Sequence, residues 1–328
     1  MARAGNTGAK AWGDSAFASG TSSVAIGSSN GASALYEAAS QTLASGARAV
    51  ALGSSSKATG SQSISLGYAA TSPGADAIAM GTTATAATAG AIALGKNAVS
   101  SGTPTFTNFT YVQNWTGATI RSSQVIVDGA TIALGTNSLA SGATAAVAIA
   151  SNATATGETS IAIGGASYAS GRTGVAIGAG TLAAGDSALA LGNTSWAAGD
   201  QSVAAGAGAY GQAAETVAIG KAAFAIGTGS IAVGSLAGVG SNTATNASNI
   251  SIGNAAGQTV TGSYNVALGY QSGQTVSGLA NTATGYQSGQ TVSGSYNIAN
   301  GYTAGQIVSG NANSAYGYSA GQTVSGFG

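Results

Sequence analysis

Glycine recurs at almost every seventh position over long stretches of the chain, and this spacing limits the fold more than any other feature. The central series comprises Gly157, Gly164, Gly171, Gly178, Gly185, Gly192, Gly199, Gly206, Gly220, Gly227 and Gly234. A heptad coiled coil is excluded, because glycine at every seventh residue costs a helix about 1 kcal/mol each relative to alanine and complementary flanking charges are missing. The spacing instead predicts short extended segments that end at glycine-assisted corners.

Alternate seven-residue units differ, so the repeat is fourteen residues long. One half carries the sequence aliphatic–Ala–aliphatic–Gly, as in residues 24–27, 78–81 and 175–178. The other half is poorer in aliphatic residues, as in residues 58–60 and 183–185. Such coils stack into a β-solenoid with successive coils about 4.8 Å apart. The predicted fold class is therefore all-β, a parallel β-roll.

Alanine or serine occupies nearly every position between the two aliphatic residues, for example Ala79, Ala176 and Ala218. A solvent-facing position would accept longer polar side chains, so this small stripe indicates that another backbone approaches closely. We expect that backbone to belong to another copy of the chain, because one coil encloses too few side chains to offset about 1–2 kcal/mol of backbone entropy per residue. The alternative is a thin solenoid in which alanine merely fills space. The expected state is an obligate oligomer.

Composition excludes several classes of function. Eight Lys+Arg balance eight Asp+Glu, and such a neutral chain lacks the charge that attracts nucleic acid or an anionic membrane surface. The chain has no Cys and no His, which removes the usual nucleophilic and zinc chemistry, and no cofactor or metal is expected. Glycine and serine interrupt every apolar run, so membrane insertion is not expected either.

Two further functions are weighed and set aside. An ice-binding solenoid needs a threonine column, but Thr83, Thr85 and Thr88 are not continued through the repeats. A depolymerase that used paired carboxylates would depend on only eight acidic residues, most of them at exposed corners. The chain is therefore expected not to be an enzyme.

From Gly262 onward the glycine spacing changes to seven plus nine, which gives a repeat of sixteen residues. Equivalent positions predict an asparagine column (Asn265, Asn281, Asn297, Asn313), a tyrosine column (Tyr270, Tyr286, Tyr302, Tyr318) and a glutamine column (Gln258, Gln274, Gln290, Gln306, Gln322). Amide ladders and stacked rings stabilise stacked strands. The alternative for the tyrosines is a platform for sugar, because each ring has a flat apolar face and a hydroxyl group.

Interruptions of the period divide the chain. The predicted parts are an N-terminal attachment segment (1–12), fourteen-residue repeats (13–234) with inserts at 28–45 and 103–128, a transition (235–252) and a sixteen-residue-repeat solenoid (253–328). The second insert supplies the candidate receptor contacts Phe106, Phe109, Tyr111, Trp115 and Arg121. The alternative is that these residues pack across the flank of the solenoid or cap an oligomer interface.

The fourteen-residue pattern, with Ala-x-Gly seven residues after aliphatic–Ala–aliphatic–Gly, resembles the head repeats of trimeric autotransporter adhesins, the YadA-like heads. The resemblance covers residues 13–234 and implies a left-handed parallel β-roll, three chains about one axis, and binding to host or matrix surfaces. The sixteen-residue Gly-Tyr-x-x-Gly-Gln repeats look like those of bacteriophage and bacterial surface fibres. Unlike complete autotransporters, the sequence shows no signal peptide, neck, stalk or membrane anchor.

These features together predict a homotrimeric phage fibre, on the tail or the head of a virion, that mediates host attachment. The alternative is the head of a trimeric autotransporter adhesin on a bacterial cell surface. Expected partners are further copies of the chain, a cell-surface glycan or protein, and another virion or envelope protein at one end. That end is either the segment 1–12 with Trp12 or the last coil, which stops at Phe327 and Gly328 without a polar cap.

Overall fold

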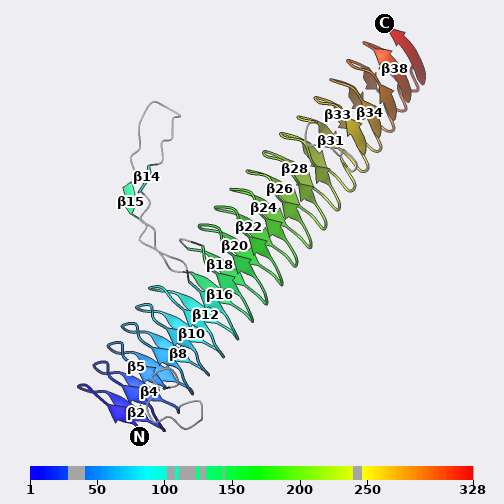
Figure 1. Cartoon of the computed structure of the whole chain (residues 1–328). Coiled ribbons are helices and arrows are strands. Elements are labelled where there is room, and N and C mark those ends of the chain that lie inside the picture. The colour runs from blue at the N-terminus through cyan, green and yellow to red at the C-terminus, as the bar shows by residue number, and fades with distance from the viewer. Residues whose placement is uncertain are drawn as a thin grey trace. The chain divides into compact units, whose positions relative to one another are not determined.

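The computed structural model describes residues 1–28, 41–101, 108–110, 123–125, 131–142, 145–238 and 246–327. It divides into two compact units, Met1–Ser160 and Ile161–Gly328, and the division falls inside the fourteen-residue repeats. Every regular element in the described ranges is a β-strand (Figure 1). These ranges accordingly hold no helix that is long and apolar enough to cross a membrane.

In the first unit each coil contributes one strand to each of two parallel sheets, which we call the aliphatic sheet and the short-strand sheet. The aliphatic sheet contains β2 (Lys10–Trp12), β4 (Val24–Ile26), β6 (Val50–Leu52), β8 (Ile64–Leu66), β10 (Ile78–Met80), β12 (Ile92–Leu94), β16 (Ile132–Leu134) and β18 (Val147–Ile149). The short-strand sheet contains β1 (Arg3–Ala4), β3 (Phe17–Ala18), β5 (Leu43–Ala44), β7 (Lys57–Ala58), β9 (Thr71–Ser72), β11 (Thr85–Ala86), β13 (Val99–Ser100), β17 (Leu139–Ala140) and β19 (Thr154–Ala155). Residues fourteen apart pair in register, as Ile78 does with Ile92.

The two inserts leave this register intact. Val24 pairs with Val50, and Ile92 pairs with Ile132, which are separations of 26 and 40 residues instead of 14. The inserts therefore add 12 and 26 residues to their coils while the flanking strands still pair as neighbours. Inside the second insert, β14 (Asn108–Thr110) and β15 (Ser123–Val125) pair as an antiparallel hairpin.

The second unit continues the same construction and then changes its period. Its aliphatic sheet contains β20 (Ile161–Ile163), β22 (Val175–Ile177), β24 (Leu189–Leu191), β26 (Val203–Ala205), β28 (Val217–Ile219), β30 (Ile231–Val233), β31 (Ile250–Ile252), β33 (Val266–Leu268), β35 (Thr282–Thr284), β37 (Ile298–Asn300) and β39 (Ser314–Tyr316). Its short-strand sheet contains β21 (Tyr168–Ala169), β23 (Leu182–Ala183), β25 (Trp196–Ala197), β27 (Tyr210–Gly211) and β29 (Phe224–Ala225). Ile250 pairs with Val266, which sets the sixteen-residue spacing.

In the sixteen-residue coils a third sheet, the Thr-Val sheet, stands opposite the aliphatic sheet. It contains β32 (Thr259–Thr261), β34 (Thr275–Ser277), β36 (Thr291–Ser293), β38 (Ile307–Asn311) and β40 (Thr323–Phe327). The central valines Val260, Val276, Val292 and Val308 form one buried cluster. A coil of sixteen residues is thus wide enough to bury valine in its interior, whereas the interior of the fourteen-residue coils holds alanine.

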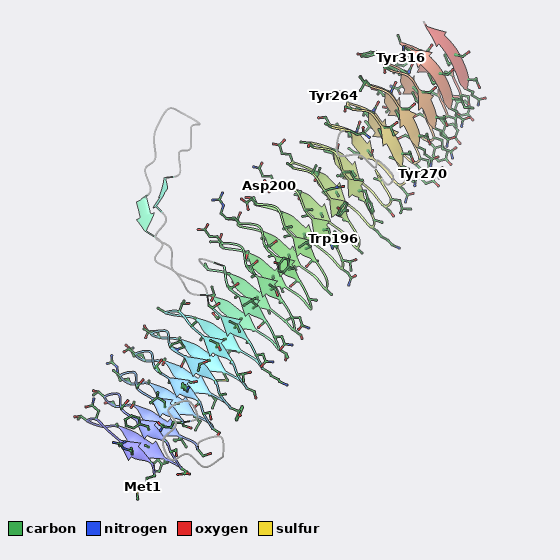
Figure 2. All side chains as sticks on the ribbon, in the orientation of Figure 1. Met1, Trp196, Asp200, Tyr264, Tyr270 and Tyr316 are labelled. Carbon is green, nitrogen blue, oxygen red and sulfur yellow. The ribbon has the colours of Figure 1, made fainter. Side chains whose placement is uncertain are left out.

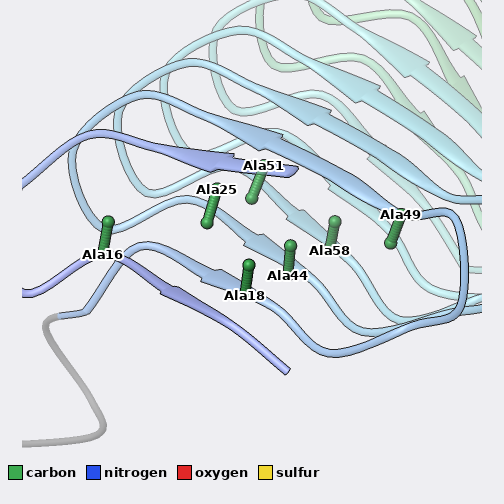
Figure 3. Packing of buried hydrophobic residues seen from close by; sticks show 7 residues of the cluster. All are labelled: Ala16, Ala18, Ala25, Ala44, Ala49, Ala51 and Ala58. Atoms are coloured by element: carbon green, nitrogen blue, oxygen red, sulfur yellow. The ribbon is translucent and has the colours of Figure 1, made fainter. Parts of the chain in front are cut away.

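The alanine between two aliphatic residues points into its own coil. Ala25 and Ala51 of the aliphatic sheet have no exposed surface and form one cluster with Ala18 and Ala44 of the short-strand sheet (Figure 3). The expectation that another copy of the chain approaches this stripe is therefore wrong. The nearby backbone is the short strand on the other side of the same coil, and only a small side chain fits between them.

Several serines of this narrow interior form their hydrogen bonds within their own corner. Ser23, Ser63 and Ser160 are fully buried, and each hydroxyl donates to the carbonyl oxygen three residues earlier, at 2.7, 2.8 and 2.7 Å. Because these hydrogen bonds close within one corner, these three serines need no partner from a neighbouring coil.

Glycine is required at the corners because the corners of successive coils touch. Gly67 has φ 131°, and a Cβ there would lie 2.6 Å from the carbonyl oxygen of Gly81 in the next coil. The same corner contains a second left-handed residue, Ala69 at φ 51°, which carries a side chain. The recurring glycines thus mark the bends as predicted. About half of the residues with positive φ, however, are not glycine.

Candidate functional site

The aliphatic residues on either side of the buried alanine point outward and form an exposed apolar stripe. Ile177 is 39% exposed, whereas Ala176 beside it is fully buried. We call the outward residues of the aliphatic sheet the aliphatic stripe. In the second unit its members are Ile161, Ile163, Val175, Ile177, Leu189, Leu191, Val203, Val217, Ile219, Ile231, Val233, Ile250, Ile252, Val266 and Leu268. A surface of this kind marks a binding interface.

The N-terminal segment is part of this architecture. β1 and β2 lie within residues 1–12, and Trp12 pairs in register with Ile26, so its 53% exposed side chain occupies a position of the aliphatic stripe. At the other end, the backbone of Phe327 pairs with Asn311 in the Thr-Val sheet. Docking of either end to another protein stays a prediction.

The stripe loses its apolar character in the last coils. Thr282 and Thr284 occupy its positions in β35, Asn300 follows in β37 and Ser314 in β39. The apolar part of the stripe is therefore confined to the coils up to Leu268, with Ile298 as a later aliphatic member.

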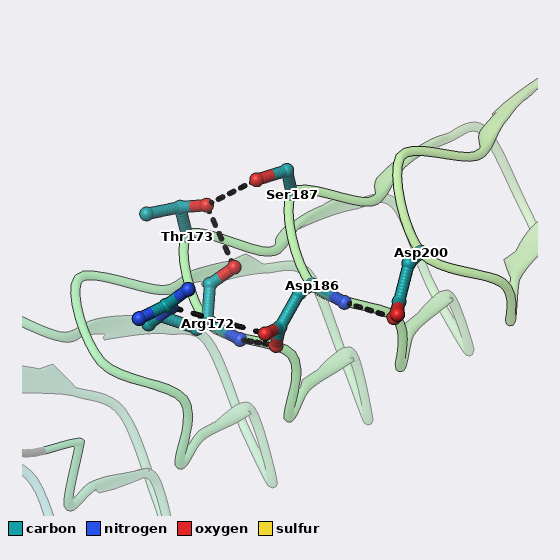
Figure 4. Close-up of polar contacts among 5 residues, drawn as sticks. All are labelled: Arg172, Thr173, Asp186, Ser187 and Asp200. Carbon is teal, nitrogen blue, oxygen red and sulfur yellow. Dashed lines mark hydrogen bonds and ion pairs between the residues drawn. The ribbon is translucent and has the colours of Figure 1, made fainter. Parts of the chain in front are cut away.

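One corner of the second unit carries a ladder of charged residues. The backbone N–H of Arg172 donates to Oδ1 of Asp186 at 2.8 Å, and the backbone N–H of Asp186 donates to Oδ1 of Asp200 at 2.9 Å (Figure 4). Arg172 Nε lies 3.8 Å from Asp186 Oδ2. Each carboxylate thus caps the backbone of the preceding coil. No group of three or more potential metal-ligating side chains occurs in the described ranges.

The predicted asparagine positions lie inside the sixteen-residue coils. Asn265, Asn281, Asn297 and Asn313 are all buried. Asn281 Nδ2 donates to Asn265 Oδ1 at 3.1 Å and to the carbonyl oxygen of Gly294 at 2.9 Å. Each buried amide therefore joins its own coil to both neighbours.

This column starts one coil earlier than the sequence suggested. The backbone N–H of Asn265 donates to Oδ1 of Asn249 at 2.9 Å, and Asn249 Nδ2 donates to the carbonyl oxygen of Gly262 at 2.9 Å. The sequence did contain a signal for this earlier member. The segment Asn–Ile–Ser–Ile–Gly that starts at Asn249 has the same pattern as Asn–Val–Ala–Leu–Gly, which starts at Asn265.

The four predicted tyrosines form parallel stacks. Ring centroids are 5.2 Å apart for Tyr270 and Tyr286, 4.9 Å for Tyr286 and Tyr302, and 5.1 Å for Tyr302 and Tyr318. The interplanar angles are 13°, 6° and 3° in the same order. Neighbouring rings cover both faces of Tyr286 and Tyr302, so these faces are closed to sugar. The geometry favours stabilisation over a glycan platform.

The glutamine column shows no comparable contacts. No side-chain hydrogen bond within the described ranges joins Gln258, Gln274, Gln290, Gln306 and Gln322. The amide contact of these coils is made instead by Gln287 Nε2, which donates to Gln271 Oε1 at 2.8 Å. These two residues follow the stacked tyrosines directly in sequence.

The candidate receptor insert is described only in part. Phe106, Tyr111, Trp115 and Arg121 lie outside the described residues. The backbone of Phe109 belongs to β14 and pairs with Gln124 of β15. Receptor contact by this insert stays a prediction.

A second aromatic cluster was not predicted from the sequence. Trp196, Tyr210 and Phe224 occupy the outward position of three successive short strands, β25, β27 and β29. Their ring centroids are 5.8 and 5.6 Å apart, with interplanar angles of 51° and 53°. The signal was their exact fourteen-residue spacing, which is harder to notice because the three residue types differ. We call these three residues the Trp196 cluster.

Comparison with known families identifies the repeat. The family model described as YadA head domain repeat (2 copies) matches residues 11–30, 18–36, 44–70, 72–98, 155–181, 183–209 and 213–237. The chain carries YadA head repeats. The resemblance of the fourteen-residue pattern to these heads is thereby confirmed. No curated protein matches the chain.

The matched segments lie in coils that pair an aliphatic strand with a short strand. The last matched segment ends at residue 237, so the sixteen-residue coils lie beyond the matched part. YadA-like heads are surface-exposed elements of structural adhesins. Trp196 and Phe224 lie within matched segments, as do the stripe strands β20, β22, β24, β26, β28 and β30. The stripe residues Ile250, Ile252, Val266 and Leu268 lie beyond the last matched segment.

Proposed function

We propose that the protein is a non-enzymatic attachment fibre that assembles as a homotrimer through the aliphatic stripe. The stripe carries this proposal, because Ile177, Ile219 and Ile252 are each about two-fifths exposed on a monomer. Monomeric proteins rarely leave such a contiguous apolar surface in water. Three copies that turn this face toward a common axis bury it, and three is the number that the resemblance to YadA-like heads implies.

Each coil then has two cores with different occupants. The inner core holds alanine and serine of one chain, and the shared core holds the aliphatic residues of three chains. This arrangement offsets the weakness of a fourteen-residue coil, since the larger apolar side chains are buried only on assembly. The short-strand sheet and the corners remain available for contact with a host.

The fibre is expected on the outside of a phage particle, on its tail or head, where it supports attachment to the host surface. The sixteen-residue repeats support this setting, since they resemble those of phage fibres. A bacterial cell surface is the second candidate setting, and the YadA head repeats favour it. Immunogold electron microscopy with antibodies against the chain distinguishes them, because label appears on virions in one case and on cell envelopes in the other.

Sedimentation equilibrium of the full chain tests the assembly. We expect a species of three times the 30.7 kDa chain mass. Lysine at two stripe positions, in the double variant Ile177→Lys and Ile219→Lys, should shift the population toward smaller species, because it places charge in an apolar contact. The matched control is the double variant Ala184→Lys and Gln212→Lys, which adds the same two charges at exposed positions directly after short strands. A stable folded monomer of the unmodified chain would overturn the proposal.

A further inference from the structure

The Trp196 cluster borders a hollow on the outer face of the short-strand sheet. The hollow has a volume of about 330 Å³ and is lined by Thr194, Trp196, Gly208, Ala209, Tyr210 and Phe224. This volume lies at the lower end of the range found for small-molecule sites. Trp196 is 45% exposed beside it (Figure 2). Gly208, in the coil that follows the coil of Trp196, has no side chain to fill the hollow.

The rings of this cluster are arranged differently from those of the tyrosine column. In that column, Tyr286 and Tyr302 are 6° from parallel, and each face is covered by a neighbour. Trp196 and Tyr210 are inclined by 51° with ring centroids 5.8 Å apart, so they are not stacked face to face. An inclined ring leaves a flat apolar surface on which another molecule can stack.

The polar groups of the cluster are unoccupied. Within the described part of the chain, neither the indole N–H of Trp196 nor the hydroxyl of Tyr210 takes part in a hydrogen bond. The hydroxyl of Thr194 at the rim likewise has no partner there. Buried or bound Trp and Tyr usually find such a partner, so these groups are free to serve a ligand that combines apolar and hydroxyl surface.

The hollow is also free of charge. None of its lining residues is acidic or basic. An anionic ligand would find no cationic side chain to pair with, and bringing its charge against an apolar wall costs solvation energy. A neutral ligand is therefore favoured over sialylated or phosphorylated ones.

We propose that the Trp196 cluster is a binding site for a neutral oligosaccharide, whose sugar rings stack on Trp196 and Tyr210. The C–H face of a pyranose meets the inclined rings, and its hydroxyl groups meet the indole N–H, the phenol and Thr194. Three coils about 4.8 Å apart give the cluster a length of about 10 Å, which suits linked sugars rather than one. This inference rests on the proposed attachment function and names the class of surface molecule that the fibre recognises.

Titration of the full chain with cellobiose, lactose, maltose and N,N′-diacetylchitobiose tests the site. The chain has three tryptophans, so the double substitution Trp12→Phe and Trp115→Phe leaves Trp196 as the only indole fluorophore. We expect at least one of these sugars to change the Trp196 emission in a saturable manner. Calorimetry on the unmodified chain should then give the same dissociation constant.

Variants separate the site from the rest of the surface. Trp196→Ala should weaken binding by about tenfold or more, because both the stacking contact and the buried apolar area of the indole are lost. Tyr210→Phe should weaken it less, since the ring remains and only the hydroxyl is lost. The matched control is Tyr168→Ala, which removes another exposed aromatic ring from the outer face of the short-strand sheet and should leave the affinity unchanged. Circular dichroism verifies that each variant retains its strands.

Three outcomes of the binding measurements would overturn the site. They are no response to any of the four neutral sugars, unchanged affinity in Trp196→Ala, or tighter binding of 6′-sialyllactose than of lactose. A drop in assembly size caused by Trp196→Ala would also overturn it, because the cluster would then be a contact between chains. If the chain is a trimer that binds none of the sugars, the sugar site is wrong but the proposed fibre function is not contradicted. If the chain is a stable monomer, the proposed function is wrong whatever the sugar titrations give.

Discussion

The side-chain oxygen of Asn281 accepts two hydrogen bonds from Asn297, one from its backbone N–H and one from its side-chain amide, each 3.0 Å long. Asn297 in turn accepts the same pair of bonds from Asn313, also at 3.0 Å. Because these residues are buried, water cannot replace a missing partner. The amide column therefore holds the sixteen-residue coils in register.

The first prediction removes one member of this column. Asn297→Ala leaves the buried N–H of Asn313 without its acceptor and the carbonyl of Gly310 without its amide donor. A buried group left without its partner costs about 1–3 kcal/mol, so the loss of the acceptor of Asn313 alone should lower the free energy of unfolding by about that amount. Urea unfolding at fixed protein concentration measures it. The control is Asn254→Ala, at an exposed asparagine without a side-chain hydrogen bond in the described ranges. Equal stability of the two variants would contradict the role of the column.

The second prediction tests which side of the aliphatic strand faces inward. Ala204 is fully buried in its coil, whereas its neighbour Ala205 lies in the outward column between Leu191 and Ile219. Ala204→Ile should destabilise the fold by about 1–3 kcal/mol or more, because the narrow interior cannot accept three further carbon atoms. Ala205→Ile should be tolerated, since isoleucine and leucine already occupy that column.

Thermal unfolding of this pair of variants at one protein concentration gives the comparison. The two substitutions add the same atoms at adjacent residues, so a difference between them reports orientation alone. If Ala205→Ile were the more harmful one, the alanine stripe would face outward and the inner core would be aliphatic.

The repeat lengths, the strand positions and the parallel stacking were predictable because each corner repeats the same requirement for glycine. Gly67 must avoid the carbonyl of Gly81, and most of the following coils repeat that contact. Registers such as Ile64 with Ile78 follow directly from that period. Strand alternation also predicted that Ile78 and Met80 share one face.

Which face is inside was not predictable from the pattern. Alternation states only that Ala79 and its aliphatic neighbours lie on opposite sides, and hydrophobicity alone assigns isoleucine to the interior. The width of the coil decides otherwise, because a fourteen-residue turn brings its two sheets too close for large side chains. The same narrow width also decides which side chains lie outside, on the aliphatic stripe and in the Trp196 cluster. The outward orientation of Trp196 and Tyr210 follows from the inward orientation of Ala197 and Gly211 beside them.

The third prediction concerns the corner ladder. Asp186→Asn keeps an oxygen that can accept the backbone N–H of Arg172 but removes the 3.8 Å ion pair with its guanidinium. Both side chains are more than half exposed, and exposed pairs contribute about 0–1 kcal/mol. The unfolding midpoint should therefore change little, and raising the salt concentration should not separate variant from parent. A large loss in urea unfolding would show that the charge itself holds this corner.

The last prediction concerns the tyrosine column. Tyr286→Ala removes the stacking contacts with Tyr270 and Tyr302, each worth about 0.5–1.5 kcal/mol beyond buried area, and should lower stability accordingly. The near-ultraviolet circular dichroism of coupled phenol rings should weaken as well. Tyr296→Ala is the matched control, because Tyr296 is 63% exposed and has no ring partner in the described ranges. Alanine already occupies its equivalent position in the neighbouring coils, at Ala280 and Ala312, with the same left-handed backbone. Equal losses of stability and of the aromatic signal in both variants would show that stacking adds nothing to the fold, and the column would then need another explanation.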